Sequence, residues 1–478
     1  MKKNFVFLLL LSALLFPQGV FAKSSNDPYL TQWSYQDINI FDAWNYGTGS
    51  KDVVVAIIDN GFDSLHPDLV DNVWKNVKEI PENGKDDDGN GYIDDVFGWN
   101  FVQEDKNSDG FLDRNEQKGD NNPRPNTSKL TDAEKKAGIF NHGTVVAGII
   151  GAVGDNTIDA AGINWKVRLM NVKVVDNSGS GDLVLLAPAI RYAVDNGASV
   201  INISMVGNNI QSDVIAAIRY ANQKGVVLVA AAGNDGRLLD GDPRYPICVD
   251  ADESKQLILG VSAIDETHHL APFSNFGSKC VDITAPGVNI FSDMRYEPTD
   301  GLDKEYGGAW NGTSFAAPFV SGAAALIKSI QPTWTSDQIY NVLLATVHKT
   351  PAIDDVVYAH LFGRGLLQVD RAAAQAMLGM VPTPAPIALP TIDQIVLGSP
   401  TPPPTQPKIV EPLSVLVFND NKYRGDVYAY KKNVEFGDPI LSQEMIFLQG
   451  LESLSRYKND FTESMYGVLY FQIGRAHV

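Results

Sequence analysis

Short apolar runs alternate with longer amphipathic stretches over residues 33–380 of this 478-residue chain. Five runs are apolar at nearly every position, as in strands buried on both faces, and cover residues 53–58, 169–174, 200–204, 226–231 and 257–263. The stretches 183–196 and 212–225 between them have the pattern of helices. This alternation predicts an α/β fold with a mostly parallel central sheet and helices on both faces.

Polar residues with complementary chemistry stand at the ends of three predicted elements. Asp59 ends the strand at 53–58, and open α/β sheets place functional groups at the carboxyl ends of their strands. His142 and Ser314 each lie where a helix of small residues begins. A serine nucleophile needs a general base and a group that orients it, as His142 and Asp59 are able to do. Taken alone, Ser314 is better explained as a helix N-cap.

The runs around these three residues, in the order Asp, His, Ser, resemble the subtilisin-like serine proteases, or subtilases. A fourth run ends at Asn234, where the family has its oxyanion-hole amide. The four runs read IIDNG at 57–61, NHGTVVAG at 141–148, VVLVAAAGN at 226–234 and NGTSFAAP at 311–318. The resemblance implies a subtilisin-like three-layer fold and an endopeptidase with catalytic Asp59, His142 and Ser314, assisted by Asn234.

Two alternatives to hydrolysis stay open at this point. One is a catalytically silent scaffold or binding protein, against which the intact set of Asp59, His142, Ser314 and Asn234 argues. The other is an enzyme of the same fold that transfers the acyl group to an amine instead of water. Labelling by a serine-directed probe separates the first alternative from an active enzyme, and the mass of the product separates the second.

The resemblance also implies that protein or peptide substrates bind in extended form between two edge segments, by β-augmentation. The residues so placed are Ser178, Gly179, Ser180 and Gly181 on one edge, Ser204, Met205, Val206 and Gly207 on the other, and Ala231, Ala232 and Gly233 beside them. The family commonly has glycine where Val206 stands. A β-branched side chain there is expected to narrow the primary specificity pocket or to disturb pairing with the substrate.

An acidic insertion at about residues 82–120, between Asp59 and His142, suggests calcium. One segment fits the twelve-residue calcium-loop pattern, with candidate ligands Asp105, Asn107, Asp109, Phe111, Asp113 and Glu116. A second repeats the start of the pattern but has Phe97 where the closing glutamate belongs; its candidates are Asp86, Asp88, Asn90, Tyr92, Asp94 and Asp95. Solvated acidic turns are the alternative for both segments.

A third calcium site follows from the resemblance alone. It pairs Asp68 with Asn156 and with the backbone carbonyls of Ile158 and Ala160. Ca²⁺ is therefore the expected cofactor, with a stabilising role.

Composition and the first residues predict an exported protein. The net charge is −19, and no basic patch is present, which argues against nucleic acid as a partner. A basic start, an apolar stretch and a small-residue site predict a signal peptide over residues 1–22 and therefore secretion, and the protein is expected to be a monomer. No later segment is apolar for long enough to span a membrane. Cys248 and Cys280 either form a disulfide or remain two buried thiols.

The chain is expected to divide where its composition changes. Residues 23–380 form the catalytic domain, 381–412 a Pro-rich linker and 413–472 part of an accessory region for adhesion or binding. Residues 473–478 match the translation of a sequencing adapter and are expected to be an artefact. Few residues separate Ala22 from the apparent domain start near Tyr29, so calcium or the C-terminal part is expected to assist folding in place of a long prosegment.

Overall fold

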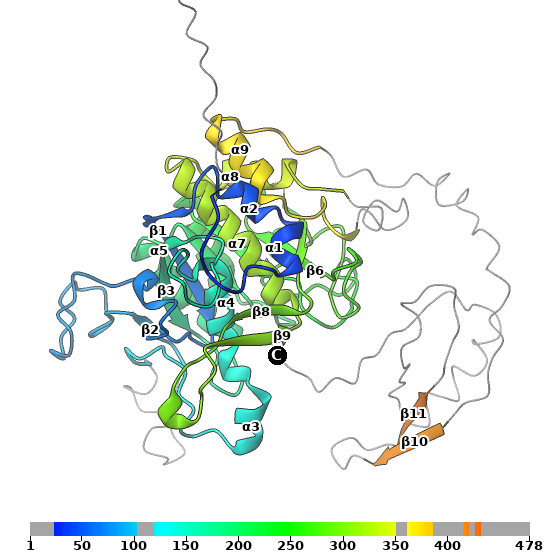
Figure 1. The fold of residues 1–478 in the computed structure, drawn as a ribbon, viewed down its shortest axis with the longest axis horizontal. Helices are drawn as coiled ribbons and strands as arrows, with labels where there is room; N and C mark the ends of the chain where they lie inside the picture. Colours follow the sequence, from blue (N-terminus) through cyan, green and yellow to red (C-terminus); the bar gives the residue numbers. More distant parts are fainter. Residues whose placement is uncertain are drawn as a thin grey trace, which may run out of the picture.

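A sheet forms the centre of the molecule (Figure 1). It has seven strands in the order β2-β3-β1-β4-β5-β6-β7. Every neighbouring pair in this sheet is parallel. The computed structural model describes residues 23–102, 119–253, 255–349, 361–385, 414–419 and 426–431. The mostly parallel α/β architecture expected from the sequence is confirmed.

The elements have the following bounds. The strands are β1 Gly49–Asp59, β2 Gly98–Asn100, β3 Lys166–Lys173, β4 Val200–Ile203, β5 Val227–Ala231, β6 Leu259–Ile264, β7 Ile283–Pro286, β8 Ile290–Asp293, β9 Tyr306–Trp310, β10 Ser414–Asn419 and β11 Asp426–Lys431. The α-helices are α1 Trp33–Asp37, α2 Ile40–Ala43, α3 Asp132–Ala137, α4 His142–Gly151, α5 Leu186–Asp195, α6 Ser212–Gln223, α7 Thr313–Ile330, α8 Ser336–Ala345 and α9 Val369–Met377. Antiparallel pairs join β8 to β9 and β10 to β11.

Two apolar cores, one on each face of the sheet, explain why its strands are apolar at every position. In β1, Val55 and Ile57 belong to one core, and their neighbours Ala56 and Ile58 belong to the other. Successive side chains of a strand point to opposite faces, so a strand covered on both faces cannot alternate between polar and apolar residues.

Helices cover both faces of the sheet and give the expected three layers. One face carries α4 and α7, with α8 and α9 packed against α7, and the other carries α5 and α6. Helix α7 runs through the middle of the fold (Figure 1). It contacts β1, β4, β5, β6 and β7. Its small residues are all buried up to Ile327, which allows this close approach.

The helix predicted at 183–196 differs in one respect, because it begins with a separate 3₁₀ turn. That turn covers Leu183–Leu185, and α5 follows from Leu186. Pro188 has no N–H to donate to the carbonyl of Val184, so one continuous α-helix would lose a bond there. Asp182 caps the turn by accepting a hydrogen bond from the Val184 N–H at 3.0 Å.

Cys248 and Cys280 form a disulfide, with their Cα atoms 4.8 Å apart, so the alternative of two free thiols does not hold. In the part of the chain that the structure describes, α7 alone has the length and apolar character of a membrane span, although no such segment was expected from the sequence. Most of α7 is buried in the protein core, which explains its composition.

Several sequence predictions fall outside the described residues. They are the signal peptide at 1–22, the calcium loop from Asp105 to Glu116, most of the linker, and the C-terminal region apart from β10 and β11.

Candidate active site

The side chains of Asp59 and His142 meet at the carboxyl edge of the sheet. Asp59 is the last residue of β1, and its Oδ1 lies 2.7 Å from Nδ1 of His142, the first residue of α4. Both residues are almost fully buried. Asn60 holds the pair in place, because its N–H donates to Asp59 Oδ1 at 2.7 Å and its side-chain oxygen accepts from the Gly143 N–H at 2.9 Å.

Gly143 is needed where α4 passes the turn after β1. A Cβ at this position would lie 2.2 Å from the backbone oxygen of Gly61. Any other residue would push α4, and with it His142, away from Asp59.

Ser314 is the second residue of α7, so the N-cap alternative for this serine is wrong. Gly312 occupies the N-cap position. The Ser314 hydroxyl donates to the backbone carbonyl of Ser204 at 3.3 Å. Its neighbour Phe315 packs against the His142 ring with the ring centres 5.1 Å apart.

His142 Nε2 is buried and has no hydrogen-bond partner among the described residues. A basic ring nitrogen in that state is available to accept a proton from a nearby hydroxyl. Bonds between a nucleophile and its base are often long without substrate and shorten when substrate is bound. Asp59, His142 and Ser314, which are far apart in the sequence, are thus gathered at one edge of the sheet.

A chain of hydrogen bonds, not anticipated from the sequence, fixes the start of α7 to the end of β4. Ser321 Oγ donates to Asn202 Oδ1 at 2.8 Å, and Asn202 Nδ2 donates to Ser204 Oγ at 2.9 Å. Ser204 Oγ in turn donates to the Ser314 carbonyl at 3.0 Å. All these side chains are buried, so the network fixes the backbone of Ser314 from within the core.

Asn234, three positions after the end of β5, is oriented by Thr313. Its Oδ1 accepts from both the N–H and the hydroxyl of Thr313, each at 2.9 Å. The same hydroxyl accepts from the Gly233 N–H at 2.9 Å. Because Oδ1 is engaged by Thr313, the Nδ2 donor of Asn234 points the other way, toward Gly312. A Cβ added to Gly312 would lie 3.4 Å from Nδ2. Thr313 was not singled out in the sequence because a Thr there is also an ordinary helix residue.

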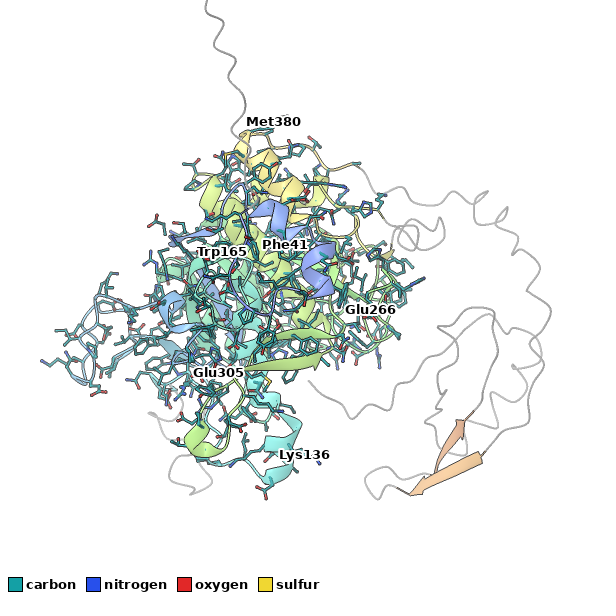
Figure 2. All side chains as sticks on the ribbon, in the orientation of Figure 1. Phe41, Lys136, Trp165, Glu266, Glu305 and Met380 are labelled. Atoms are coloured by element: carbon teal, nitrogen blue, oxygen red, sulfur yellow. A yellow bond between two sulfur atoms is a disulfide. The ribbon has the colours of Figure 1, made fainter. Side chains whose placement is uncertain are left out.

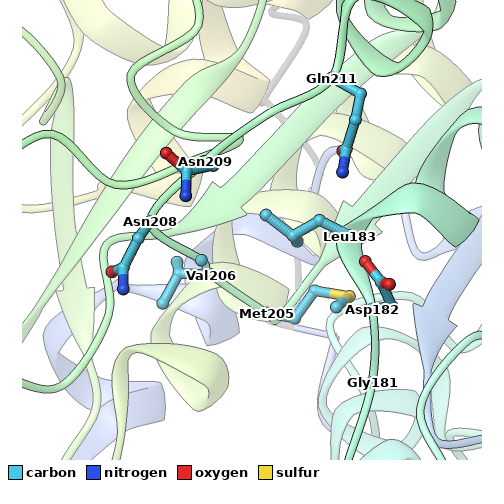
Figure 3. A pocket seen from close by; sticks show the side chains of 9 residues that line it. Gly181, Asp182, Leu183, Met205, Val206, Asn208, Asn209 and Gln211 are labelled. Atoms are coloured by element: carbon cyan, nitrogen blue, oxygen red, sulfur yellow. The ribbon is translucent and has the colours of Figure 1, made fainter.

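An open groove of about 450 Å³ lies beside these residues, between the two predicted edge segments (Figure 3). It is lined by Gly181, Asp182, Leu183, Met205, Val206, Gly207, Asn208, Asn209 and Gln211. Asp176 shapes one edge by accepting from the N–H groups of Ser178 and Ser180 at 2.8 and 2.9 Å. On the other edge, Gly207 exchanges two 2.9 Å backbone bonds with Tyr245. The backbone N–H groups of Ser178, Ser180 and Gly207 are therefore already bonded within the chain, the first two to a side chain and the third to backbone.

Val206 and Gly233 approach each other closely across the position expected for the primary pocket. A Cβ added to Gly233 would lie only 3.0 Å from Cγ2 of Val206. Gly233 has φ of +96°, and a Cβ there would also lie 2.5 Å from Asn275 Nδ2. The valine side chain thus occupies space that a glycine at 206 would leave open.

Comparison with known proteins identifies the family. Residues 50–365, more than half of the chain, match the model of the subtilase family. This chain belongs to the subtilase family. It is 33% identical to thermitase of Thermoactinomyces vulgaris over 306 residues, which cover 64% of this chain and 85% of thermitase. It is also 33% identical to a thermophilic serine proteinase of Bacillus sp. strain AK1 over 310 residues, and spans 60% of that relative.

Structural comparison agrees with this assignment. A solved protease from Pseudoalteromonas arctica superposes with a TM-score of 0.55 and 28% identity, over 74% of this chain and 100% of that chain. The resemblance drawn from the sequence and the class of enzyme are therefore confirmed: this subtilase is a serine endopeptidase.

The acidic loop of this subtilase from Asp86 to Asp95 receives a carboxylate from outside the loop. Oxygens of Glu79, Asp86 and Asp88 all lie within 4.8 Å of one another. Glu79 also accepts from the N–H groups of Asp87 and Asp88 at 2.9 and 3.0 Å. The sequence pattern has no closing glutamate after the loop, and Glu79 was missed because it precedes the loop.

The other predicted calcium ligands of this loop make hydrogen bonds within the protein. Asn90 and Asp95 are joined by a 3.1 Å bond, and Asp95 also accepts from the Tyr192 hydroxyl at 2.6 Å. Asp94 points its oxygens at the N–H groups of Asn83 and Gly84. The N–H of Tyr92 donates to Asn90 Oδ1 at 2.8 Å. The backbone carbonyl is the group with which Tyr92 would bind an ion.

The third predicted calcium group assembles around Asp68. Asn156 Nδ2 donates to Asp68 Oδ1 at 2.6 Å, whereas the buried Asp68 Oδ2 has no partner in the described residues. Burial raises the pKa of Asp68 to about 8, with repulsion from Asp159 and Asp27 adding to the shift. Asp27, which the sequence reasoning missed, accepts from the N–H groups of Asn156 and its neighbours. A buried carboxylate oxygen without a donor fits a hard cation.

We expect Thr313→Val to lower kcat for peptide hydrolysis about tenfold while KM changes little. The substitution keeps the shape of the side chain but removes the hydroxyl that orients Asn234, and one such bond is worth roughly 1 kcal/mol. Steady-state kinetics with a peptide substrate provides the measurement. Thr284→Val is the matched control, because the buried Thr284 hydroxyl has no partner. An equal loss in both variants would refute the orienting role of Thr313.

Proposed function

We propose that this subtilase is a secreted, calcium-stabilised endopeptidase in which Asp59, His142 and Ser314 form the catalytic triad. The observation that carries the proposal is the 2.7 Å contact between Asp59 and His142 next to the start of α7. It places a buried carboxylate on one ring nitrogen of His142 and leaves the other nitrogen without a partner. That is the arrangement a general base requires.

In this mechanism Ser314 Oγ attacks the carbonyl carbon of the scissile peptide bond as His142 Nε2 takes the hydroxyl proton. His142 then donates that proton to the leaving amine, and an acyl-enzyme remains on Ser314. Water, deprotonated by His142, hydrolyses the ester. Asp59 holds the proton on Nδ1, so that Nε2 has the free electron pair, and it stabilises the imidazolium that forms.

The negative charge of the tetrahedral intermediate is assigned to two donors. One is Asn234 Nδ2, and the other is the Ser314 N–H, which lies in the first turn of α7 and has no intrahelical partner. The N-terminus of the long helix α7 adds a favourable field for an anion. Both donors are fixed before substrate arrives, Asn234 by Thr313 and Ser314 by Ser204.

The test of this assignment is reaction with a fluorophosphonate probe together with cleavage of a denatured protein. We expect the unmodified chain to do both and Ser314→Ala to do neither. Asn234→Ala should keep labelling at a reduced rate and lose kcat by about 10²–10³-fold, the loss seen for an oxyanion-hole donor in subtilisin. Ser34→Ala is the control, because the Ser34 hydroxyl is buried and unpartnered. Equal labelling of the unmodified chain and Ser314→Ala would reject the triad.

Extended protein or peptide chains are the substrates that the groove supports. Within the described residues Val206 has no backbone hydrogen bond, while Gly207 next to it pairs outward with Tyr245. Alternate residues of a strand turn their backbone groups to opposite sides, so Val206 is free to pair with a substrate strand. The Asp59–His142 contact supports an active enzyme over a catalytically silent protein. Transfer of the acyl group to an amine would use the same residues, and the mass of the product separates it from hydrolysis.

Val206→Gly should shift the preference at the residue before the scissile bond from small toward large apolar side chains. Removing the valine opens space beside Gly233, and each additional buried methylene is worth about tenfold or more in kcat/KM. Peptides that differ only at this residue provide the measurement. Asn209→Gly, on the same groove but away from Gly233, is the control. An unchanged ranking of the peptides in Val206→Gly would show that Val206 does not form this wall.

Calcium would be held by Asp68, Asn156 and Asp27 with nearby carbonyls, and by the Asp86 loop with Glu79. When bound, the ion neutralises carboxylates that are close together and joins segments that are far apart in the sequence. Its contribution is to the stability of the fold, and the chemistry at Ser314 does not need it. A further ion at the loop from Asp105 to Glu116 is part of the same proposal.

Calcium should raise the melting temperature, and more so at alkaline pH. Without calcium the folded chain keeps a proton on Asp68 up to about pH 8, whereas an unfolded Asp releases it above about pH 4. The calcium-free protein therefore loses stability as pH rises between these values, and calcium binds only the ionised form. Melts of calcium-stripped Ser314→Ala at about pH 6 and pH 9, with and without added calcium, provide the measurement. Asn156→Ala should reduce the gain, and an absence of any gain would reject the calcium sites.

Secretion is supported by the predicted leader at residues 1–22 and by the Cys248–Cys280 disulfide. Disulfides persist mainly in oxidising compartments outside the cytosol.

A further inference from the structure

We propose that His66, Asp159 and Asp293 form a buried site for a divalent transition-metal ion of the zinc type. The three residues come from separate parts of the fold. His66 lies in the turn after β1, Asp159 in the loop after α4, and Asp293 is the last residue of β8. One potential ligand atom from each lies within 4.8 Å of the other two.

The carboxylates of this cluster have lost water without gaining hydrogen bonds. Asp293 is completely buried, and neither of its oxygens has a partner among the described residues. Asp159 is 8% exposed, and its Oδ2 also has no partner. An isolated buried carboxylate is costly unless a positive charge or strong donors compensate it. Asp159 and Asp293 also repel each other when both are charged, so the pair needs a cation more than a single buried carboxylate would.

No arginine of the surrounding segments supplies that charge. Arg124 pairs with Asp63 at 2.7 Å and with Glu297 at 3.1 Å. Arg295, two residues after Asp293, is directed at the same two carboxylates, each at 3.7 Å. The positive charges of this region are thus used at Asp63 and Glu297, and the cluster stays without compensation from them.

His66 is held in an orientation typical of metal ligands. Its Nε2 lies 2.9 Å from the backbone carbonyl of Glu305, a residue labelled in Figure 2, so Nε2 carries the proton and donates. Nδ1 then keeps its electron pair, which accepts a 3.1 Å hydrogen bond from the Asp68 N–H, and a metal ion on Nδ1 would have to break that bond. Metal-binding histidines commonly donate their second N–H to a carbonyl in this way.

The donor set distinguishes this site from the calcium group next to it. One imidazole nitrogen with two carboxylates suits zinc and related ions, whereas calcium takes oxygen ligands. The calcium group uses Asp68 and Asn156, which are joined by their own 2.6 Å bond. The two sites adjoin, because His66 and Asp68 are two residues apart, but they share no ligand.

A metal at this place would tie the turn that follows Asp59 to β8 and to the loop after α4. The expected effect is on stability, because none of the three ligands touches His142 or Ser314 in the described contacts. The proposal is therefore independent of the triad.

Titration calorimetry of Ser314→Ala with Zn²⁺, in saturating calcium, tests the site. We expect one Zn²⁺ per chain, a higher melting temperature, and a visible absorption band when Co²⁺ replaces Zn²⁺. Asp293→Asn, which keeps the side-chain shape, should bind at least about 100-fold more weakly, since loss of a mere outer-shell partner costs 10–100-fold. Asp282→Asn is the control: Asp282 is a buried carboxylate on another part of the sheet, bonded to Gly260 and Gln256.

His66→Gln is a second variant that keeps a donor for the Glu305 carbonyl, and it should also lose the Co²⁺ band. Asn156→Ala should weaken the calcium response and leave Zn²⁺ binding intact. Equal Zn²⁺ affinity of Asp293→Asn and Asp282→Asn, or loss of all Zn²⁺ binding in saturating calcium, would overturn the proposal. Fluorophosphonate labelling of Asp293→Asn with Ser314 intact reports on the triad separately, so the two proposals fail by different measurements.

Discussion

The contact between Asp59 and His142 depends on one constraint, which is that a parallel sheet brings the carboxyl ends of its strands to the same edge. Asp59 at the end of β1, Ser204 after β4 and the segment after β5 that leads to Asn234 are neighbours for this reason alone. Helices α4 and α7 begin at that edge, so His142 and Ser314 arrive there from the opposite direction. The arrangement holds only because small residues let both helices pack closely, as Gly143 does against Gly61.

Buried carboxylates of this subtilase differ sharply in how they are compensated. Asp59 has His142 and the Asn60 N–H, and Asp63 has Arg124. Asp59 Oδ2 has no partner of its own, but Asp68 and Asp293, which are equally buried, also lack any positively charged partner in the described residues. Because an uncompensated charge opposes folding, these groups either hold protons or bind cations. A carboxylate paired with histidine or arginine positions its neighbours, and a buried one without such a partner indicates where an ion belongs.

Much of the fold was predictable from the sequence because its strands are covered on both faces and so are apolar throughout, as residues 53–58 show. The role proposed for Ser314 did not follow from its own run, which taken alone is better explained as an N-cap, but from the runs around Asp59, His142 and Asn234 and their resemblance to the subtilases. Glu79, Asp27 and Thr313 were missed because their roles depend on contacts between distant segments. Glu79 precedes the acidic loop that it enters, and Thr313 has a role only through Asn234, 79 positions away. No local pattern records such pairings.

In the groove, the contact between Val206 and Gly233 limits the size of the substrate side chain that fits beside them. Val206 presses toward Gly233, and Gly233 cannot become another residue, because its φ is +96° and Asn275 lies against the same face. Asn275 is itself fixed, since it donates to the Ala232 carbonyl at 2.8 Å and accepts from Asp235 and Arg237. The wall opposite Val206 is therefore rigid. Changes in the width of this part of the groove must come from residue 206, while the residues that fix Asn234 and Ser314 stay unaffected.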